Sequence, residues 1–181
     1  MVVTNDQDLD ARVRSLRNLA FGNASRYLHT DLGYNYRLSN VLAAIGVAQM
    51  ERVDGLIRKK LEIASWYNGL LGGNRELTLP VQNKGAKNVY WMYGLLIDES
   101  SAVSRDELMA ALGRKGIETR AFFTPMHKQP ALLERGLFKS DRLRVSEDLS
   151  RRGLYIPSGL PLKRQQAEEV SQTILGLVRH R

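Results

Sequence analysis

The sequence contains no cysteine, so it can form neither a disulfide nor a thiolate metal site. No apolar run approaches the roughly 20 residues that a helix needs to cross a bilayer. The first residues also lack the charged and then apolar pattern of a signal peptide, and we therefore expect a cytoplasmic protein without membrane contact. The three histidines are far apart and form no His-x-x-x-His pair, which predicts that no metal is bound.

Glycine-based motifs are missing as well. The sequence has no Gly-x-x-x-x-Gly-Lys phosphate loop, no Gly-x-Gly-x-x-Gly dinucleotide fingerprint and no Gly-x-Ser-x-Gly nucleophile elbow. These absences argue against the nucleotide-hydrolysing, dinucleotide-dependent and serine-hydrolase classes that carry such motifs.

The charge is strongly positive but dispersed. The chain of 181 residues carries a net charge of +8, with 43% hydrophobic and 25% charged residues, a composition typical of globular proteins. Lysine and arginine are scattered, and no zinc-finger spacing, RNA-binding aromatic signature or basic region accompanies them. Solvated helix faces are the simplest interpretation, a surface that attracts anionic sugar nucleotides is the alternative, and we predict no nucleic-acid partner.

Residues 33–54 are the most informative stretch, Gly-Tyr-Asn-Tyr-Arg-Leu-Ser-Asn-Val-Leu-Ala-Ala-Ile-Gly-Val-Ala-Gln-Met-Glu-Arg-Val-Asp. The first five residues form a polar and aromatic turn, and Ser39 is suited to cap the helix that follows. Apolar residues then recur at three- and four-residue spacing, among them Leu42 and Ile45, which predicts a buried helical face. We expect this helix to run to about Leu71, with a kink or thinning at Gly55.

The remaining pattern predicts helices and short strands. Helices are expected over 8–19, from 104 to about 113, over 143–153 and over 162–180, and strands over 76–80, 89–98, 117–123 and 154–156. Residues 20–32 are irregular, and connections of that length are often functional. A domain boundary is predicted near residue 72, with an α/β or α+β domain after it.

The stretch at residues 33–49 resembles the signature of the DegT/StrS-type sugar aminotransferases. The resemblance also covers the opening Met-Val-Val-Thr-Asn-Asp, Arg-Tyr-Leu-His at 26–29 and Thr-Arg-Ala-Phe-Phe-Thr-Pro-Met-His-Lys-Gln-Pro at 119–130. These are pyridoxal-phosphate enzymes with the aspartate-aminotransferase fold, fold type I. The resemblance implies that residues 1–72 belong to the large cofactor-binding domain with its long connecting interface helix, and residues 73–181 to the small C-terminal α/β domain.

The resemblance also implies roles for individual residues. The residue matching Asn35 reaches the cofactor phosphate across a dimer interface in relatives, although an asparagine here can equally fix a turn. Arg37 suits an anion contact or an ordinary surface ion pair. His127 matches a histidine near the substrate, and Tyr34 and His29 are further substrate-binding candidates, with a structural role as the alternative for each histidine.

Relatives carry a long segment before the part that this chain matches, and it includes the lysine that forms the Schiff base. We therefore expect no catalytic residue in this chain. Lys59 and Lys60 are predicted to lie on a solvated helix face. Tyr90, Trp91 and Tyr93 can be a stacking platform for bases or sugars, but the alternating strand pattern favours packing into a core.

The function implied by the resemblance is transamination with pyridoxal 5′-phosphate, from an amino acid such as glutamate to a nucleotide-linked keto sugar, in polysaccharide or antibiotic sugar biosynthesis. The chain is expected to be inactive alone and to pair as a homodimer or with the N-terminal half of the same enzyme. A non-catalytic interaction or regulatory module, a sugar dehydratase of the same family and an unrelated basic binding protein are the alternatives.

Overall fold

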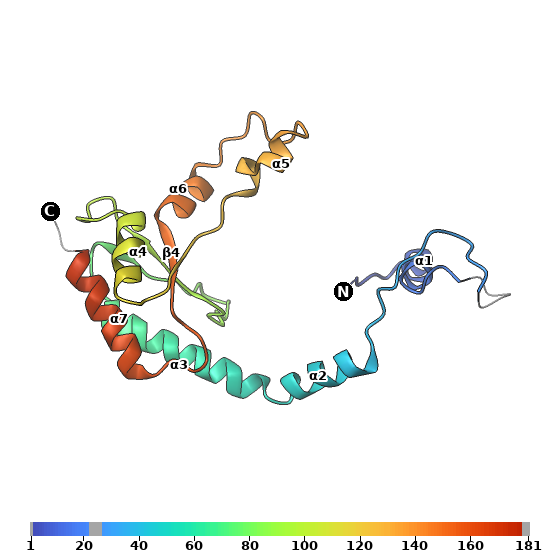
Figure 1. Cartoon of the computed structure of the whole chain (residues 1–181), viewed down its shortest axis with the longest axis horizontal. Coiled ribbons are helices and arrows are strands. Elements are labelled where there is room, and N and C mark those ends of the chain that lie inside the picture. Colours follow the sequence, from blue (N-terminus) through green and yellow to red (C-terminus); the bar gives the residue numbers. More distant parts are fainter. Residues whose placement is uncertain (1, 22–26, 179–181) are drawn as a thin grey trace. The chain divides into compact units, whose positions relative to one another are not determined.

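The computed structural model describes residues 2–21 and 27–178, and the chain divides into two compact units, Met1–Val53 and Asp54–Arg181. The first unit holds α1 (Gln7–Arg17) and α2 (Asn40–Met50). The second holds α3 (Val53–Leu71), β1 (Leu77–Thr78), β2 (Tyr93–Ile97), α4 (Arg105–Arg114), β3 (Arg120–Ala121), the short 3-10 helix η1 (Met126–Lys128), α5 (Pro130–Leu133), α6 (Arg144–Arg152), β4 (Gly153–Ile156) and α7 (Arg164–Leu177) (Figure 1).

Helix α1 begins directly after its capping residue, Asp6. The Asp6 carboxylate accepts hydrogen bonds from the backbone N–H groups of Asp8 and Leu9, at 2.9 and 3.0 Å. This satisfies two of the donors that a helix start leaves without partners. The predicted helix over 8–19 is confirmed, although α1 ends at Arg17.

The predicted long helix after Ser39 is two helices. Ser39 caps α2 as expected, accepting a hydrogen bond from the Leu42 N–H at 3.4 Å. The helical hydrogen-bond pattern then tightens, because the Arg52 N–H bonds to Gln49 three residues back, and a new helix begins at Val53. The break therefore precedes Gly55, and the expectation of a kink at Gly55 is wrong.

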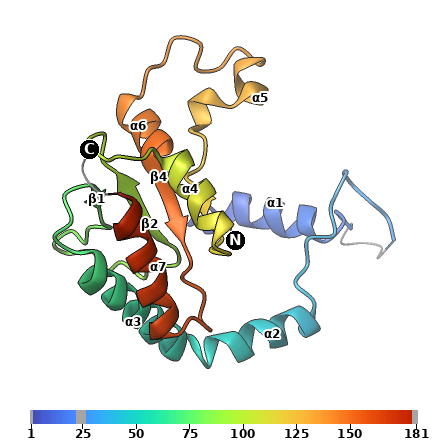
Figure 2. The same ribbon diagram turned by 60° about the vertical axis from the view of Figure 1, so that its left-hand side comes forward.

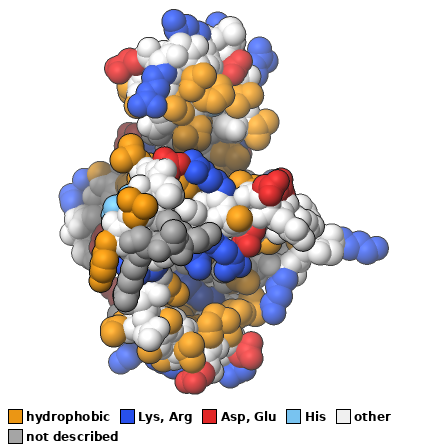
Figure 3. Space-filling model, turned by 90° about the vertical axis from the view of Figure 1, so that its right-hand side faces the viewer, with side chains coloured by type: hydrophobic (Ala, Val, Ile, Leu, Met, Phe, Trp, Pro, Cys, Tyr) orange, Lys and Arg blue, Asp and Glu red, His pale blue; other side chains and the backbone are white. Residues whose placement is uncertain are grey.

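Helix α2 has no buried residue, so the predicted buried face over this part of the stretch is wrong. Leu42 and Ile45 are 56% and 58% exposed. Apolar side chains lie on all sides of α2, and no described residue of its own unit buries them. Figure 3 shows one face of the molecule, on which hydrophobic side chains lie open in several groups between charged ones.

The second unit is built on one antiparallel sheet in the order β1-β2-β4-β3. Alternate residues of its strands point to opposite faces. Tyr93, Leu95 and Ile97 of β2 are buried on one face, together with Leu154 and Ile156 of β4. This alternation fixes the register of β2 against β4, because a shift by one residue would expose the whole apolar set.

Three helices cover that buried face. Ile63 and Tyr67 of α3, Leu108 of α4 and Ile174 of α7 join the strand residues in a single hydrophobic core. Figures 1 and 2 show α3 and α7 lying side by side beneath the sheet. The structure confirms the mixed α/β class that the sequence predicts.

The strands are shorter than predicted. The strand expected over 89–98 begins only at Tyr93, because Tyr90 has a left-handed backbone with φ 47°, which interrupts extended structure. The strand expected over 117–123 is reduced to Arg120–Ala121. The closing helix ends at Leu177, and the last residues of its predicted range, 179–180, lie outside the described residues.

The observed units divide at residue 53, whereas the predicted domain boundary lies at residue 72. The cause is α3, whose apolar face packs onto the sheet of the second unit. The assignment of residues 1–72 and 73–181 to two domains of a larger fold stays a prediction.

The buried hydroxyl of Tyr67 provides a test of this core. It donates a hydrogen bond to the Pro157 carbonyl at 2.7 Å, and burial raises the pKa of this phenol. Tyr67→Phe leaves that carbonyl without its partner, so we expect the free energy of unfolding to fall by about 1–3 kcal/mol in urea denaturation. Tyr36→Phe at an exposed position is the control and should change it by less than about 0.5 kcal/mol. Equal effects of the two variants would contradict the packing described here.

Candidate functional site

The turn at residues 33–37 is held by backbone hydrogen bonds to the end of α1. The Tyr34 N–H donates to the Leu16 carbonyl at 2.6 Å, and the Tyr36 N–H donates to the Arg17 carbonyl at 3.0 Å. In return, the Leu19 N–H donates to the Tyr34 carbonyl at 3.1 Å. The turn therefore has a defined geometry although it lies outside any helix or sheet.

Gly33 allows the chain to come this close. A Cβ atom at this position would lie 2.3 Å from the Leu19 carbonyl carbon and 2.4 Å from the Ala20 nitrogen. Leu19 and Ala20 both have left-handed backbones, with φ 65° and 49°, which turns the chain back on itself at this point. Only glycine fits against that backbone without moving it.

Asn35 and Arg37 are exposed on this turn and contact each other. The Arg37 Nε donates to Asn35 Oδ1 at 3.3 Å. Within residues 2–21 and 27–178, Arg37 has no carboxylate partner and the Asn35 amide nitrogen has no hydrogen-bond acceptor. The pair presents an amide and a guanidinium group, and both can donate to phosphate or carboxylate oxygens.

The tyrosines of the turn stack on each other. The rings of Tyr34 and Tyr36 are 5.2 Å apart and nearly parallel, at 10°, and both are exposed. The stack leaves one ring face of each tyrosine open beside Asn35.

His29 is fixed against the same backbone. Its Nδ1 lies 2.7 Å from the Leu19 carbonyl oxygen, and because a carbonyl only accepts, Nδ1 carries the proton. The ring also packs against Phe21 at 4.9 Å. His29 and Tyr34 thus both hydrogen bond to Leu19, so the structure brings together four of the five predicted site residues in the first unit. Arg26, which belongs to the same motif as His29, lies outside the described residues.

The fifth predicted residue, His127, lies in η1 of the second unit and is 3% exposed. Its Nε2 is 2.9 Å from Oε1 of Glu147, in the first turn of α6. The same carboxylate oxygen is 3.4 Å from the Lys128 ammonium group. Because Nε2 is engaged by a carboxylate, Nδ1 is the ring atom left for any other hydrogen bond.

Glu147 was not predicted from the sequence. The hydrogen bond from His127 and the neighbouring Lys128 lower the pKa of its carboxyl group. It therefore stays ionised and fixes the orientation of the histidine ring. Its position in the first turn of a predicted helix is the only sequence signal, and that signal does not distinguish it from an ordinary helix-terminal glutamate.

Lys60 does not lie on a solvated face as predicted. Its ammonium group donates to the carbonyls of Trp91 and Ser158, at 2.7 and 2.6 Å. Partial burial lowers the pKa of this lysine. It joins α3 to the loops that precede β2 and follow β4, which periodicity along a helix cannot reveal.

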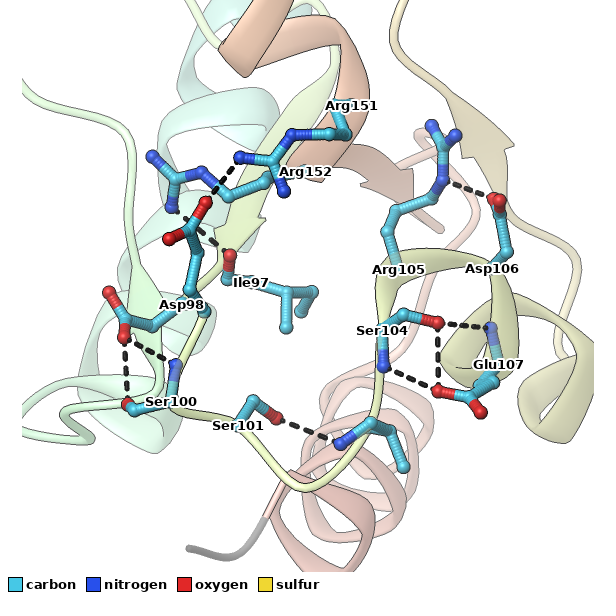
Figure 4. Close-up of a pocket in the computed structure, with 12 residues that line it drawn as sticks. Ile97, Asp98, Ser100, Ser101, Ser104, Arg105, Asp106, Glu107, Arg151 and Arg152 are labelled. Atoms are coloured by element: carbon cyan, nitrogen blue, oxygen red, sulfur yellow. Dashed lines mark hydrogen bonds and ion pairs between the residues drawn. The ribbon is translucent and has the colours of Figure 1, made fainter.

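A charged hollow of about 600 Å³ lies between the end of β2 and the start of α4 (Figure 4). Its arginines all pair with carboxylates: Arg105 with Asp106, Arg151 with Glu99, and Arg152 with Asp148. The hydrogen bond from Arg152 lowers the pKa of Asp148. Since these charges already have partners, the hollow has a structural role.

Two further features bear on the predicted binding partners. Among the described residues, no group of three or more His, Asp or Glu side chains is arranged to hold a metal ion, and the prediction that no metal is bound stays a prediction. No described helix is both long and apolar enough to cross a membrane.

Comparison with known proteins places this geometry in a family. The DegT/DnrJ/EryC1/StrS aminotransferase family matches residues 1–175, which include the turn at 33–37 and the His127 loop. The chain belongs to this family. The GDP-perosamine synthases of Caulobacter vibrioides and Vibrio cholerae are 35% and 36% identical to it over 172 and 178 residues, covering 94% and 96% of the chain.

Solved structures of this aminotransferase family have the same fold. DesV of S. venezuelae, crystallised with a ketimine intermediate, superposes with a TM-score of 0.81 at 28% identity over 99% of the chain. PseC of Helicobacter pylori has a TM-score of 0.82 at 20% identity over 97% of the chain, which supports the fold alone. The predicted membership of this aminotransferase family and the predicted fold class are confirmed.

The chain spans less than half the length of these relatives, 45% and 47% of the two GDP-perosamine synthases and 46% of DesV. The roles predicted for Tyr34, Asn35, Arg37, His29 and His127 are not tested by the comparisons and stay predictions.

Gly33→Ala tests the geometry of the turn. The added methyl group collides with the Leu19–Ala20 backbone and breaks the hydrogen bonds that the Tyr34 and Tyr36 N–H groups donate to Leu16 and Arg17. We therefore expect amide protection from hydrogen exchange at these two residues to fall at least about tenfold. Gly46→Ala is the matched control, because nothing lies within 4 Å of a Cβ there. Alanine should stabilise α2 by about 0.5–1 kcal/mol. Unchanged protection in the Gly33 variant would rule out the close approach.

The His127–Glu147 pair predicts a pH dependence of stability. Because the folded-state pKa of Glu147 is lowered, its contribution is present above the ordinary value of 4.5 and is lost as the pH falls through the lowered value. Glu147→Gln should therefore be less stable than the unaltered chain at pH 7, and the difference should shrink below pH 4.5. Urea unfolding between pH 7 and pH 3 measures this, with Glu118→Gln as an exposed control. A difference that does not vary with pH would count against the pair.

Proposed function

We propose that this chain is the C-terminal part of a pyridoxal-phosphate-dependent aminotransferase that transfers an amino group from glutamate to a nucleotide-linked keto sugar. Membership of the aminotransferase family supports the reaction class. The names of the relatives, which include GDP-perosamine synthase, support a sugar joined to a nucleotide. The single structural observation that carries the proposal is the exposed Asn35–Arg37 pair on a turn fixed to α1.

The donors of this turn suit the phosphate group of the cofactor. The Asn35 amide donates without adding charge, and the Arg37 guanidinium complements the negative phosphate. Asn35 is exposed on a fixed backbone, so it is able to reach a phosphate held by another protomer. When bound, pyridoxal 5′-phosphate supplies an electron sink for bond breaking at the amino-group carbon.

The lysines described above are not suited to bind the cofactor covalently. The Lys60 ammonium group is engaged by two carbonyl oxygens, and Lys59 pairs with Glu62 at 2.8 Å and lies over the Trp66 ring at 4.4 Å. Following the family resemblance, we propose that the reactive amine lies in another part of the enzyme, and we expect this chain to be inactive alone.

The proposal also gives substrate-binding roles to residues of each unit. In the first unit these are Tyr34 and Arg37 of the turn together with His29. In the second unit it is His127, through its Nδ1 atom, since Glu147 occupies Nε2. The roles are binding and orientation, because no side chain among them is placed to act as the covalent amine.

A partner surface belongs to the same proposal. Helix α2 carries apolar side chains that no described residue of its unit covers, including Val41 and Met50 at 73% and 66% exposure. A continuous apolar helix of this kind is typical of a protein interface. We assign it to a homodimer or to the N-terminal half of the enzyme. A cytoplasmic location and the absence of a nucleic-acid partner stay predictions.

A chimera tests the proposal. The chain replaces the matching C-terminal residues of the Caulobacter GDP-perosamine synthase, and cofactor absorbance and amino transfer from glutamate are measured. We expect a coloured, active chimera. Asn35→Ala should weaken cofactor affinity about tenfold, as the loss of one charge-assisted hydrogen bond predicts.

Asn40→Ala at the start of α2 is the matched control in the same chimera, because it removes an exposed amide five positions away and should leave cofactor affinity unchanged. A folded chimera with no cofactor absorbance, or equal losses in the two variants, would overturn the proposal.

A further inference from the structure

Four aromatic side chains of the second unit converge on the face of the sheet opposite the core. Tyr155 of β4 stacks on Phe122 at 4.5 Å, and it lies 6.4 Å from Trp91 and 6.2 Å from Phe123. We call these four residues the aromatic platform. They come from three separate segments of the sequence, so it is the fold that brings their rings together.

Two glycines form the floor of the platform. A Cβ atom at Gly94 would lie 2.7 Å from Phe122 Cζ, and one at Gly153 would lie 2.3 Å from Phe122 Cδ2. The Phe122 ring therefore rests directly on the backbone of β2 and β4. Any other residue at either position would push the ring, and Tyr155 with it, away from the sheet.

The rings on top of this floor are exposed to solvent. Trp91 is 64% exposed and Phe123 is 72% exposed, in contrast to the buried Tyr90 and Tyr93. The expectation that this aromatic group packs into the core is therefore wrong for Trp91. The backbone of Trp91 is nevertheless fixed, because its carbonyl accepts the Lys60 hydrogen bond at 2.7 Å. The platform offers rigid aromatic faces, and these cost little conformational entropy when a ligand stacks on them.

A positively charged side chain, Arg120, lies beside the aromatic platform. Arg120 of β3 is the register partner of Tyr155, so the two side chains leave the sheet on the same face. The Arg120 side chain is 75% exposed, and among the described residues its guanidinium group has only a long contact with Glu118, at 3.7 Å. A hollow of about 390 Å³ lies alongside, lined by Arg120, Tyr155 and Ser158 among others.

We propose that the aromatic platform and Arg120 bind the nucleoside diphosphate portion of the substrate. Stacked aromatic rings accept the flat face of any base, and an adjacent guanidinium suits phosphate oxygens. An apolar protein partner would contact the rings but would add nothing to the long Glu118 contact of the exposed Arg120 guanidinium. The inference rests on the proposed function, which supplies a nucleotide-linked substrate.

Tryptophan fluorescence tests this inference on the chain itself. The chain has 2 tryptophans, so Trp66→Phe leaves Trp91 as the only emitter. We expect GDP or dTDP to quench Trp91 saturably, and inorganic pyrophosphate to have no such effect, because it has no base to stack. Phe123→Ala should weaken nucleotide binding about tenfold, as the loss of one stacking contact predicts. Val145→Ala, an exposed apolar residue of α6, should not.

Arginine variants separate the two parts of the ligand. Arg120→Ala should weaken binding of GDP but not of guanosine, whereas Arg164→Ala on α7 should affect neither. The absence of saturable quenching by both GDP and dTDP overturns the inference. So does quenching that depends on protein concentration without nucleotide, since that result assigns the platform to contacts between copies of the chain.

The experiments can reject the nucleotide-binding platform and the transaminase assignment independently of each other. An active chimera combined with no nucleotide quenching rejects the platform alone. Saturable nucleotide binding combined with a chimera that never acquires cofactor absorbance rejects the transaminase assignment alone.

Discussion

The close approach of Gly33 to the backbone of Leu19 and Ala20 is the contact on which the proposed phosphate site depends. It allows the hydrogen bonds that join Tyr34 and Tyr36 to the end of α1. Without them, the segment carrying Asn35 and Arg37 would be an open loop, and ordering it on binding would cost about 1–2 kcal/mol per residue. The turn is therefore arranged before any ligand arrives.

Local signals in the sequence predicted local structure well. Ser39 caps the helix that it was expected to cap, and Asp6 and Ser104 cap α1 and α4 in the same way, because a capping side chain bonds only to backbone within its own first turn. The strand over 89–98 was predicted too long, because the left-handed conformation of Tyr90 leaves no trace in the alternation of side chains.

Contacts between distant segments were not predictable from periodicity. Lys60 looks like a solvated helix residue until the Trp91 and Ser158 carbonyls are brought to it. Glu147 becomes the partner of His127 only when α6 packs beside η1. The turn at 33–37 was found because its residues are contiguous and resemble a family signature, whereas the aromatic platform is assembled from three separate segments.

The exposed apolar helix α2, the exposed amide and guanidinium groups of Asn35 and Arg37 and the engaged ammonium group of Lys60 fit one account, in which the chain is one part of a two-part site. The most direct test is to titrate the chain into the separately produced N-terminal portion of a family member with pyridoxal phosphate present. The account predicts that the visible absorbance of the bound cofactor develops fully at equal concentrations of the two parts. Full absorbance with this chain alone would contradict it.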